Sequence, residues 1–197
     1  MIHKMKTTSA EKRIRLFNTA AGQFGFFTAK QAENAGYERN HFHSHAASGE
    51  WVQEQRGLYR LTNFPQAPEQ EYIKWLLWSR NKADVVQGCL SHETALSIYE
   101  LGDNMPNQIH ITVPLDFRRA KETPALVRLH RENLLSGSIQ VEKGLAVTSP
   151  AKTFEDLLKE GLTELPSLKE ALAKALDRGL ITRRQLSASQ LLTNLEK

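Results

Sequence analysis

Residues 25–61 most constrain the fold of this chain, because they place two short helices and a hairpin in close succession. Thr28 and Gln31 have the three-residue spacing of a capping box, which predicts a short helix that ends at Gly36. A further helix is expected over about residues 38–48, before a glycine. Helices this short need a shared core, so the segment has to fold as one packed unit.

A hairpin is expected after these helices. Strands should flank Arg56 and Gly57, where glycine relieves the strained backbone of a tight turn. Trp51 and Tyr59 suit strand positions on either side of that turn. Together with a capped first helix over about residues 9–21, the pattern predicts a winged helix-turn-helix.

The positive charge of the chain is concentrated in this segment. Residues 1–63 hold nine Lys/Arg and five Asp/Glu, a net charge of +4, and the whole chain holds 26 and 22, which is also +4. The remaining 17 basic and 17 acidic residues therefore cancel. A local basic excess attracts phosphate, so we expect this segment to bind DNA rather than merely to aid solubility.

The expected recognition helix would turn Phe42 and Ala46 inward and its polar side chains outward. Its asparagine can pair with adenine, its histidines and serine can bond to base edges, and its arginine can hold a phosphate. An ordinary solvated helix face is the alternative, and the basic tip of the hairpin favours DNA. The residues expected to contact DNA are Thr28, Lys30, Arg39, Asn40, His41, His43, Ser44, Arg56 and Arg60.

Three histidines alternate along this helix. His41 and His45 lie one turn apart and could grip a metal ion, but no third ligand follows at a recognisable spacing. We therefore expect no metal and no cofactor. Polar contact with DNA, stronger when the imidazoles are protonated, is the favoured role for this cluster. His45 is alternatively half-buried beside the core.

The second part of the chain predicts a mixed α+β domain that ends in helices. Two prolines in residues 63–68 indicate a linker, so the expected domains are residues 1–63, which bind DNA, and residues 69–197. The expected elements are helices over 69–80 and 92–101, strands over 108–113, 126–130, 139–142 and 145–147, and helices opened by caps at Ser149, Ser167 and Thr182.

Signals of an enzyme are weak. Ser91, His92 and Glu93 are adjacent on an expected helix, so they point in different directions, and Ser91 is expected to be a helix cap. Glu155 and Asp156 could pass for catalytic carboxylates, but lysines within one turn favour surface ion pairs. We expect no enzymatic activity; catalysis on nucleic acid or on a partner protein is the competing hypothesis.

Other features bear on location and partners. A lone Cys89 excludes an internal disulfide and a cysteine-rich zinc site, and no apolar signal segment follows the basic residues near position 1, so a cytoplasmic protein is expected. Residues 116–121 form a basic loop that either contacts nucleic acid or a partner, or is simply solvated.

Five segments, in order along nearly the whole chain, resemble the AbiEi-type antitoxins. They are FTAKQA (27–32), RGLYRL (56–61), SHETAL (91–96), IHITVP (109–114) and VTSPAKTFEDL (147–157). The resemblance implies an antitoxin of a bacterial type IV, abortive-infection toxin–antitoxin operon. It also implies that the winged helix represses the operon at inverted repeats and that the C-terminal domain counteracts a nucleotidyltransferase-like toxin. A stand-alone regulator, whose C-terminal domain senses a ligand or oligomerises, is the alternative.

Overall fold

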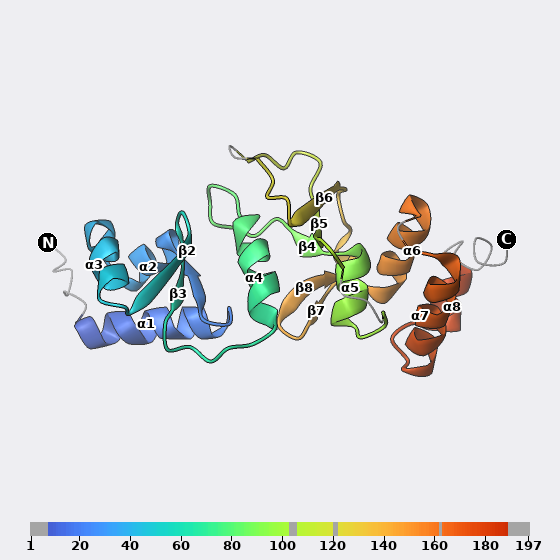
Figure 1. Cartoon of the computed structure of the whole chain (residues 1–197), viewed down its shortest axis with the longest axis horizontal. Coiled ribbons are helices and arrows are strands. Elements are labelled where there is room, and N and C mark those ends of the chain that lie inside the picture. The colour runs from blue at the N-terminus through green and yellow to red at the C-terminus, as the bar shows by residue number, and fades with distance from the viewer. Residues whose placement is uncertain (1–7, 103–105, 120–121, 162, 189–197) are drawn as a thin grey trace, which may run out of the picture. The chain divides into compact units, whose positions relative to one another are not determined.

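The computed structural model describes residues 8–102, 106–119, 122–161 and 163–188. The chain forms two compact units, Met1–Val86 and Gln87–Lys197, each of which is described by itself (Figure 1). The elements of the first unit are α1 (Ser9–Ala21), β1 (Phe26–Thr28), α2 (Ala29–Ala35), a 3-10 turn η1 (Arg39–His41), α3 (Phe42–Ala47), β2 (Trp51–Gln55), β3 (Leu58–Leu61) and α4 (Glu69–Trp78).

The winged helix-turn-helix expected from the sequence is confirmed. Capping boxes at Thr8 and Thr28 open α1 and α2. The helix expected over residues 38–48 is divided into η1 and α3. Strand β1 was not expected; it pairs antiparallel with β3, which in turn pairs antiparallel with β2, so the wing belongs to a three-stranded sheet.

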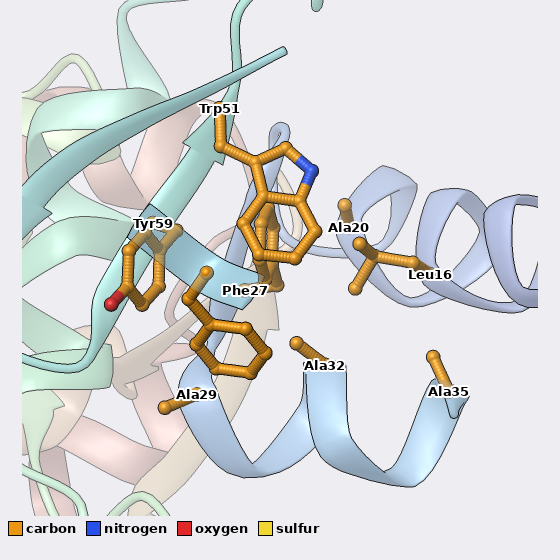
Figure 2. Close-up of a cluster of buried hydrophobic side chains, with 9 residues drawn as sticks. Leu16, Ala20, Phe27, Ala29, Ala32, Ala35, Trp51 and Tyr59 are labelled. Carbon is orange, nitrogen blue, oxygen red and sulfur yellow. The ribbon is translucent and has the colours of Figure 1, made fainter. Parts of the chain in front are cut away.

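An aromatic core joins the helices of this unit to its sheet. The ring of Trp51 lies 4.9 Å from that of Phe27, in edge-on geometry (Figure 2). It also lies 5.3 Å from the ring of Phe42, again edge-on. The Tyr59 ring of β3 stacks on that of Phe27 at 5.8 Å, and it lies equally far from the ring of Trp51. Because Phe42 belongs to α3 and Tyr59 to the wing, one cluster of rings fixes the position of α3 relative to the wing.

The first unit continues past the expected linker. The Gln70 side chain of α4 donates a hydrogen bond of 2.9 Å to the carbonyl of Phe24, and Ile73 and Leu77 of the same helix are buried. Farther along, the Arg80 guanidinium donates a bond of 2.8 Å to the carbonyl of Gly57. Whereas the sequence placed the second domain from residue 69, the compact units divide between Val86 and Gln87.

A mixed five-stranded sheet forms the centre of the second unit, in the order β6-β5-β4-β8-β7. Strands β5 and β6 run parallel, as do β4 and β8, and the other neighbours are antiparallel. Its elements are β4 (Cys89–Leu90), α5 (His92–Ile98), β5 (Ile109–Val113), β6 (Val127–Arg131), a 3-10 turn η2 (Ser136–Ser138), β7 (Ile139–Glu142), β8 (Leu145–Thr148), α6 (Pro150–Glu160), α7 (Leu165–Asp177) and α8 (Arg183–Ala188).

The helix caps expected in this unit are only partly confirmed. The Ser149 side chain caps α6, and Thr182 exchanges capping bonds with Gln185 before α8. The cap expected at Ser167 is wrong, because α7 begins at Leu165, two residues earlier. Ser91 occupies the N-cap position of α5 but makes no capping bond with its side chain.

The structure bears on two further expectations for the second unit, the surface ion pairs of α6 and the basic loop over residues 116–121. Asp156 pairs with Lys152 as the spacing predicted, but the carboxyl group is buried rather than on the surface. In the basic loop over residues 116–121, Phe117 is buried, and residues 120–121 lie outside the described residues. Across the described chain, the helices are too short and polar for any of them to traverse a bilayer.

Candidate nucleic-acid interface

A hollow of about 720 Å³ lies on the first unit, between the helix-turn-helix and the wing. It is bordered by three separate pieces of chain: α2 with η1 and α3, the hairpin of β2 and β3, and the segment that follows α4. Its charged and polar lining residues are Lys30, Glu33, Arg39, His43, Gln53, Arg56, Arg80, Asn81, Lys82 and Asp84. Five of these are basic and two are acidic, so the hollow is a positively charged surface suited to phosphate.

The recognition segment presents polar side chains because Phe42 anchors it. Phe42 is buried in the aromatic core, and the residues before and after it, from Arg39 to Ser44, are exposed. Arg39 lies 3.5 Å from a carboxylate oxygen of Glu33, but 73% of its side chain is exposed. A solvated pair of this kind is worth less than about 1 kcal/mol, so the guanidinium can turn to a phosphate at small cost.

The wing tip is held in place by its backbone. Gly57 has φ +75°, a left-handed conformation that suits glycine, and its carbonyl accepts hydrogen bonds from the Ala29 amide at 3.0 Å and from Arg80 at 2.8 Å. The neighbouring Arg56 side chain is exposed at the edge of the hollow. Within the described ranges of the chain, Arg56 has no ion-pair partner. The turn therefore projects a cation from a fixed backbone.

Two of the residues expected to contact DNA are occupied elsewhere. Thr28 is buried, and its hydroxyl both caps α2 and donates a bond of 2.5 Å to Asp84. Arg60 was expected to be exposed, but only 15% of its side chain is, because it donates a bond of 2.9 Å to Glu54 across the hairpin. Both side chains hold the interface together from within.

The histidines of the recognition helix have different surroundings. His41 and His43 are exposed, whereas His45 is half-buried and stacks on Trp51 at 4.5 Å. The Nδ1 atom of His45 lies 2.7 Å from a carboxylate oxygen of Glu50. His45 is therefore engaged in packing, as the alternative interpretation predicted. In the part of the chain that the structure describes, these histidines do not gather with a third ligand.

The segment after α4 supplies a part of this surface that the sequence did not reveal. Arg80 forms an ion pair of 2.9 Å with Asp84, and burial lowers the pKa of the guanidinium while Asp84 opposes that shift. The Asn81 side chain accepts bonds from two amides of the loop, and Lys82 is exposed beside it. The first domain predicted from the sequence ended at residue 63, so Arg80 and Lys82 were not assigned to the interface. The signal that could have indicated them is a pair of basic residues just after an amphipathic helix.

Comparisons with known proteins give a family match for the winged helix and a likeness of fold for the chain. No curated protein matches the sequence. The crystal structure of the RV2827C protein from Mycobacterium tuberculosis covers 98% of this chain and 79% of its own, with a TM-score of 0.53 and 16% identity, which shows a likeness of fold alone. Residues 15–62 match the model of a family described as a transcriptional regulator, AbiEi antitoxin. The resemblance expected from the sequence is thus confirmed over residues 15–62, which are similar to the regulator domain of the AbiEi antitoxins.

Proposed function

We propose that the chain represses transcription by binding double-stranded operator DNA at inverted repeats through the first unit. The observation that carries the proposal is the convergence of Arg39, His43 and Arg56 on one hollow, although they come from different elements. A helix that enters the major groove while a hairpin tip contacts the backbone or minor groove needs this arrangement.

The exposed residues divide by chemistry. Asn40 and Ser44 offer hydrogen bonds to base edges, and Asn is suited to adenine. Lys30, Arg39 and Lys82 carry charge for phosphates, which position a protein without reading sequence. Lys30 already donates a bond of 3.1 Å to the carbonyl of Ala83, so it also steadies the loop that bears Lys82.

Arg56→Ala tests the proposal directly. Loss of one phosphate contact should weaken binding of the full chain to its promoter and reduce the log–log salt slope by about 0.9. Fluorescence anisotropy with promoter DNA at several salt concentrations measures both quantities. Arg15→Ala is the matched control, because Arg15 is an exposed cation on α1 outside the hollow. Equal losses in both variants would mean that only net charge matters, and would overturn this interface.

Asn40→Ala separates base reading from charge. The substitution keeps the net charge, so the salt slope should stay the same while discrimination between base pairs at one position falls by about 1–3 kcal/mol. Binding to a set of single-base operator variants measures this discrimination. Unaltered discrimination at every position would remove Asn40 from the base-reading set.

We further propose that the full chain is the antitoxin of a type IV operon and that the second unit, Gln87–Lys197, counteracts a nucleotidyltransferase-like toxin. The support is the regulator family matched by the winged helix, together with a separate second unit. Co-expression with the product of a nucleotidyltransferase-like gene from the same operon tests it. Restored growth is the expected result; continued toxicity would favour a stand-alone regulator.

A further inference from the structure

Three histidines that are far apart in sequence meet in the second unit. His92 is the first residue of α5, His110 lies on β5 and His130 lies on β6, and all three are buried. One ring nitrogen from each lies within 4.8 Å of the other two. Histidine is seldom buried without a specific partner, so a cluster of three needs an explanation.

The parallel pairing of β5 with β6 creates half of this cluster. Thr112 lies opposite His130 in the register, and His110 is two residues before Thr112, on the same face of the sheet. The two imidazoles therefore approach diagonally, with 3.1 Å between His110 Nδ1 and His130 Nε2. The His92 ring stacks on that of His130, with 3.6 Å between centroids. Three elements thus converge on one point.

His92 is oriented by its neighbours. Its Nδ1 atom lies 2.9 Å from the Ser91 hydroxyl, which in turn accepts a bond of 2.8 Å from Thr112. This is why Ser91 does not cap α5. In the metal-bound state His92 Nδ1 would carry the proton and donate it to the Ser91 hydroxyl, which leaves the lone pair of Nε2 for the ion.

The carboxylates of Glu160 and Glu93 lie beside the histidine rings. Glu160 at the end of α6 places Oε1 2.9 Å from His130 Nδ1 and 3.4 Å from His92 Nε2. Glu93 places Oε2 3.6 Å from His110 Nε2. A carboxylate on the outer nitrogen of a histidine is the usual way in which proteins orient metal ligands. The inner nitrogens, His110 Nδ1 and His130 Nε2, face each other.

The backbone at His92 adds an independent observation. Its φ is +53°, a left-handed conformation that non-glycine residues rarely adopt. Such conformations concentrate at sites where a side chain has to be held in one place.

We propose that His92, His110 and His130 bind a divalent metal ion of the zinc class, with the fourth position open to water and with Glu160 orienting His130 from its outer nitrogen. Imidazole is a ligand of zinc, and tetrahedral bonds of about 2.0–2.1 Å place neighbouring ligand atoms about 3.4 Å apart. The 3.1 Å between His110 Nδ1 and His130 Nε2 is close to that value, and the His92 ring, which is stacked on that of His130, would have to turn so that its Nε2 atom points at the ion. The ion would cross-link α5, β5 and β6, and Glu160 would join α6 to the site through His130, a role separate from DNA binding.

Zinc titration of the metal-free full chain, in competition with a coloured chelator, tests the site. One equivalent is expected to bind. His110→Gln should lower the affinity at least 100-fold, and Glu160→Gln, at a partly exposed position, should lower it about 10- to 100-fold. His41→Gln is the matched control, because His41 is an exposed histidine of the first unit and should leave zinc binding unchanged.

Three results would overturn the proposal. They are the absence of tight zinc binding, full affinity in both His110→Gln and Glu160→Gln, and loss of the zinc in His41→Gln. Cobalt(II) supplies a test that needs no variant and therefore survives misfolding of His110→Gln. The unaltered chain should give the intense visible bands of four-coordinate cobalt, which zinc then abolishes; the weak spectrum of the hydrated ion would show that the histidines form only a hydrogen-bonded network.

Discussion

The two units differ in where they keep their polar groups. Among the described residues, three buried polar side chains belong to the first unit and nine to the second. The first unit has an aromatic and alanine core, and of the histidines that the structure describes there, His41 and His43 are exposed and His45 is half-buried. The second unit buries His92, His110 and His130. Polar side chains on a surface are hydrogen-bonded by water and need only a stable support beneath them. Polar side chains in an interior need hydrogen-bond partners within the protein.

This difference predicts how each unit responds to substitution. Loss of packing should dominate in the first unit, and loss of a polar partner in the second. Hydrogen exchange of amides in β2 and β3, compared with that in β5 and β6, reports on the two units separately.

Trp51→Ala should have the largest effect, because the indole contacts rings from α3, β1 and β3. Truncating a buried tryptophan costs about 3–5 kcal/mol, so the amides of β2 and β3 should lose that much protection. Ile14→Ala, at a side chain that is 60% exposed, is the control and should change little. An equal loss in β5 and β6 would mean that the two units unfold together, which would break the comparison.

Lys152→Met tests the polar interior of the second unit. Lys152 Nζ lies 2.7 Å from Asp156 Oδ1, and Asp156 Oδ2 has no hydrogen-bond partner among the described residues. Removing the lysine leaves a buried carboxylate unpaired, which should cost about 3 kcal/mol near neutral pH in urea unfolding. Lys159→Met, at an exposed position on the same helix, is the control. Equal stability of parent and Lys152→Met would show that the pair contributes nothing.

The loss in Lys152→Met should depend on pH. Burial raises the pKa of Asp156 above its ordinary 3.8, and Lys152 opposes that shift. Without the lysine the native pKa rises further, so between the two pKa values the native state binds more protons than the unfolded state. Stability then increases as the pH falls. The gap to the parent should shrink from about pH 7 to about pH 5; a gap that widens would exclude Asp156 as the cause.

The same contrast explains what the sequence could predict. The winged helix was predictable because its signals are local: the Thr28 capping box, the Arg56-Gly57 turn and the alternation around it all act within a few residues. The cap at Ser167 was misplaced because Pro166, in the first turn of α7, is the stronger start signal. Strand β1 is only three residues long and carries no alternation, so pairing with β3 was needed to reveal it.

The histidine cluster was not predictable in this way. His92, His110 and His130 are separated by 18 and 20 residues, with no shared motif. Their meeting depends on which strands are neighbours and on the parallel register of β5 and β6, which alternation alone does not specify. The histidines considered as metal ligands from the sequence were those around His43, because they are close together in sequence. Closeness in space between distant residues cannot be read from the sequence alone.

Gly57→Ala should have an intermediate effect on the wing. A left-handed conformation at a non-glycine residue costs about 1–2 kcal/mol, and the added Cβ would lie 3.4 Å from Arg80 Nη2. The free energy of opening that protects the amides of β2 and β3 from hydrogen exchange should fall by that amount, and promoter binding should weaken. Gly137→Ala is the matched control, because its Cβ would meet no atom within 4 Å. Similar results for both variants would show that the wing tolerates another backbone conformation.

Thr8→Ala and Ser167→Ala should have the smallest effects, and opposite ones. Thr8 forms a full capping box with Glu11, so removing its hydroxyl should cost the first unit about 1 kcal/mol. Ser167 lies inside α7, exposed and without a capping role, so alanine should leave the second unit unchanged or stabilise it by a few tenths of a kcal/mol. Thermal unfolding monitored by circular dichroism compares the two variants. Destabilisation by Ser167→Ala would support the helix cap at Ser167 that the sequence pattern predicted. It would mean that α7 starts after Ser167 rather than at Leu165.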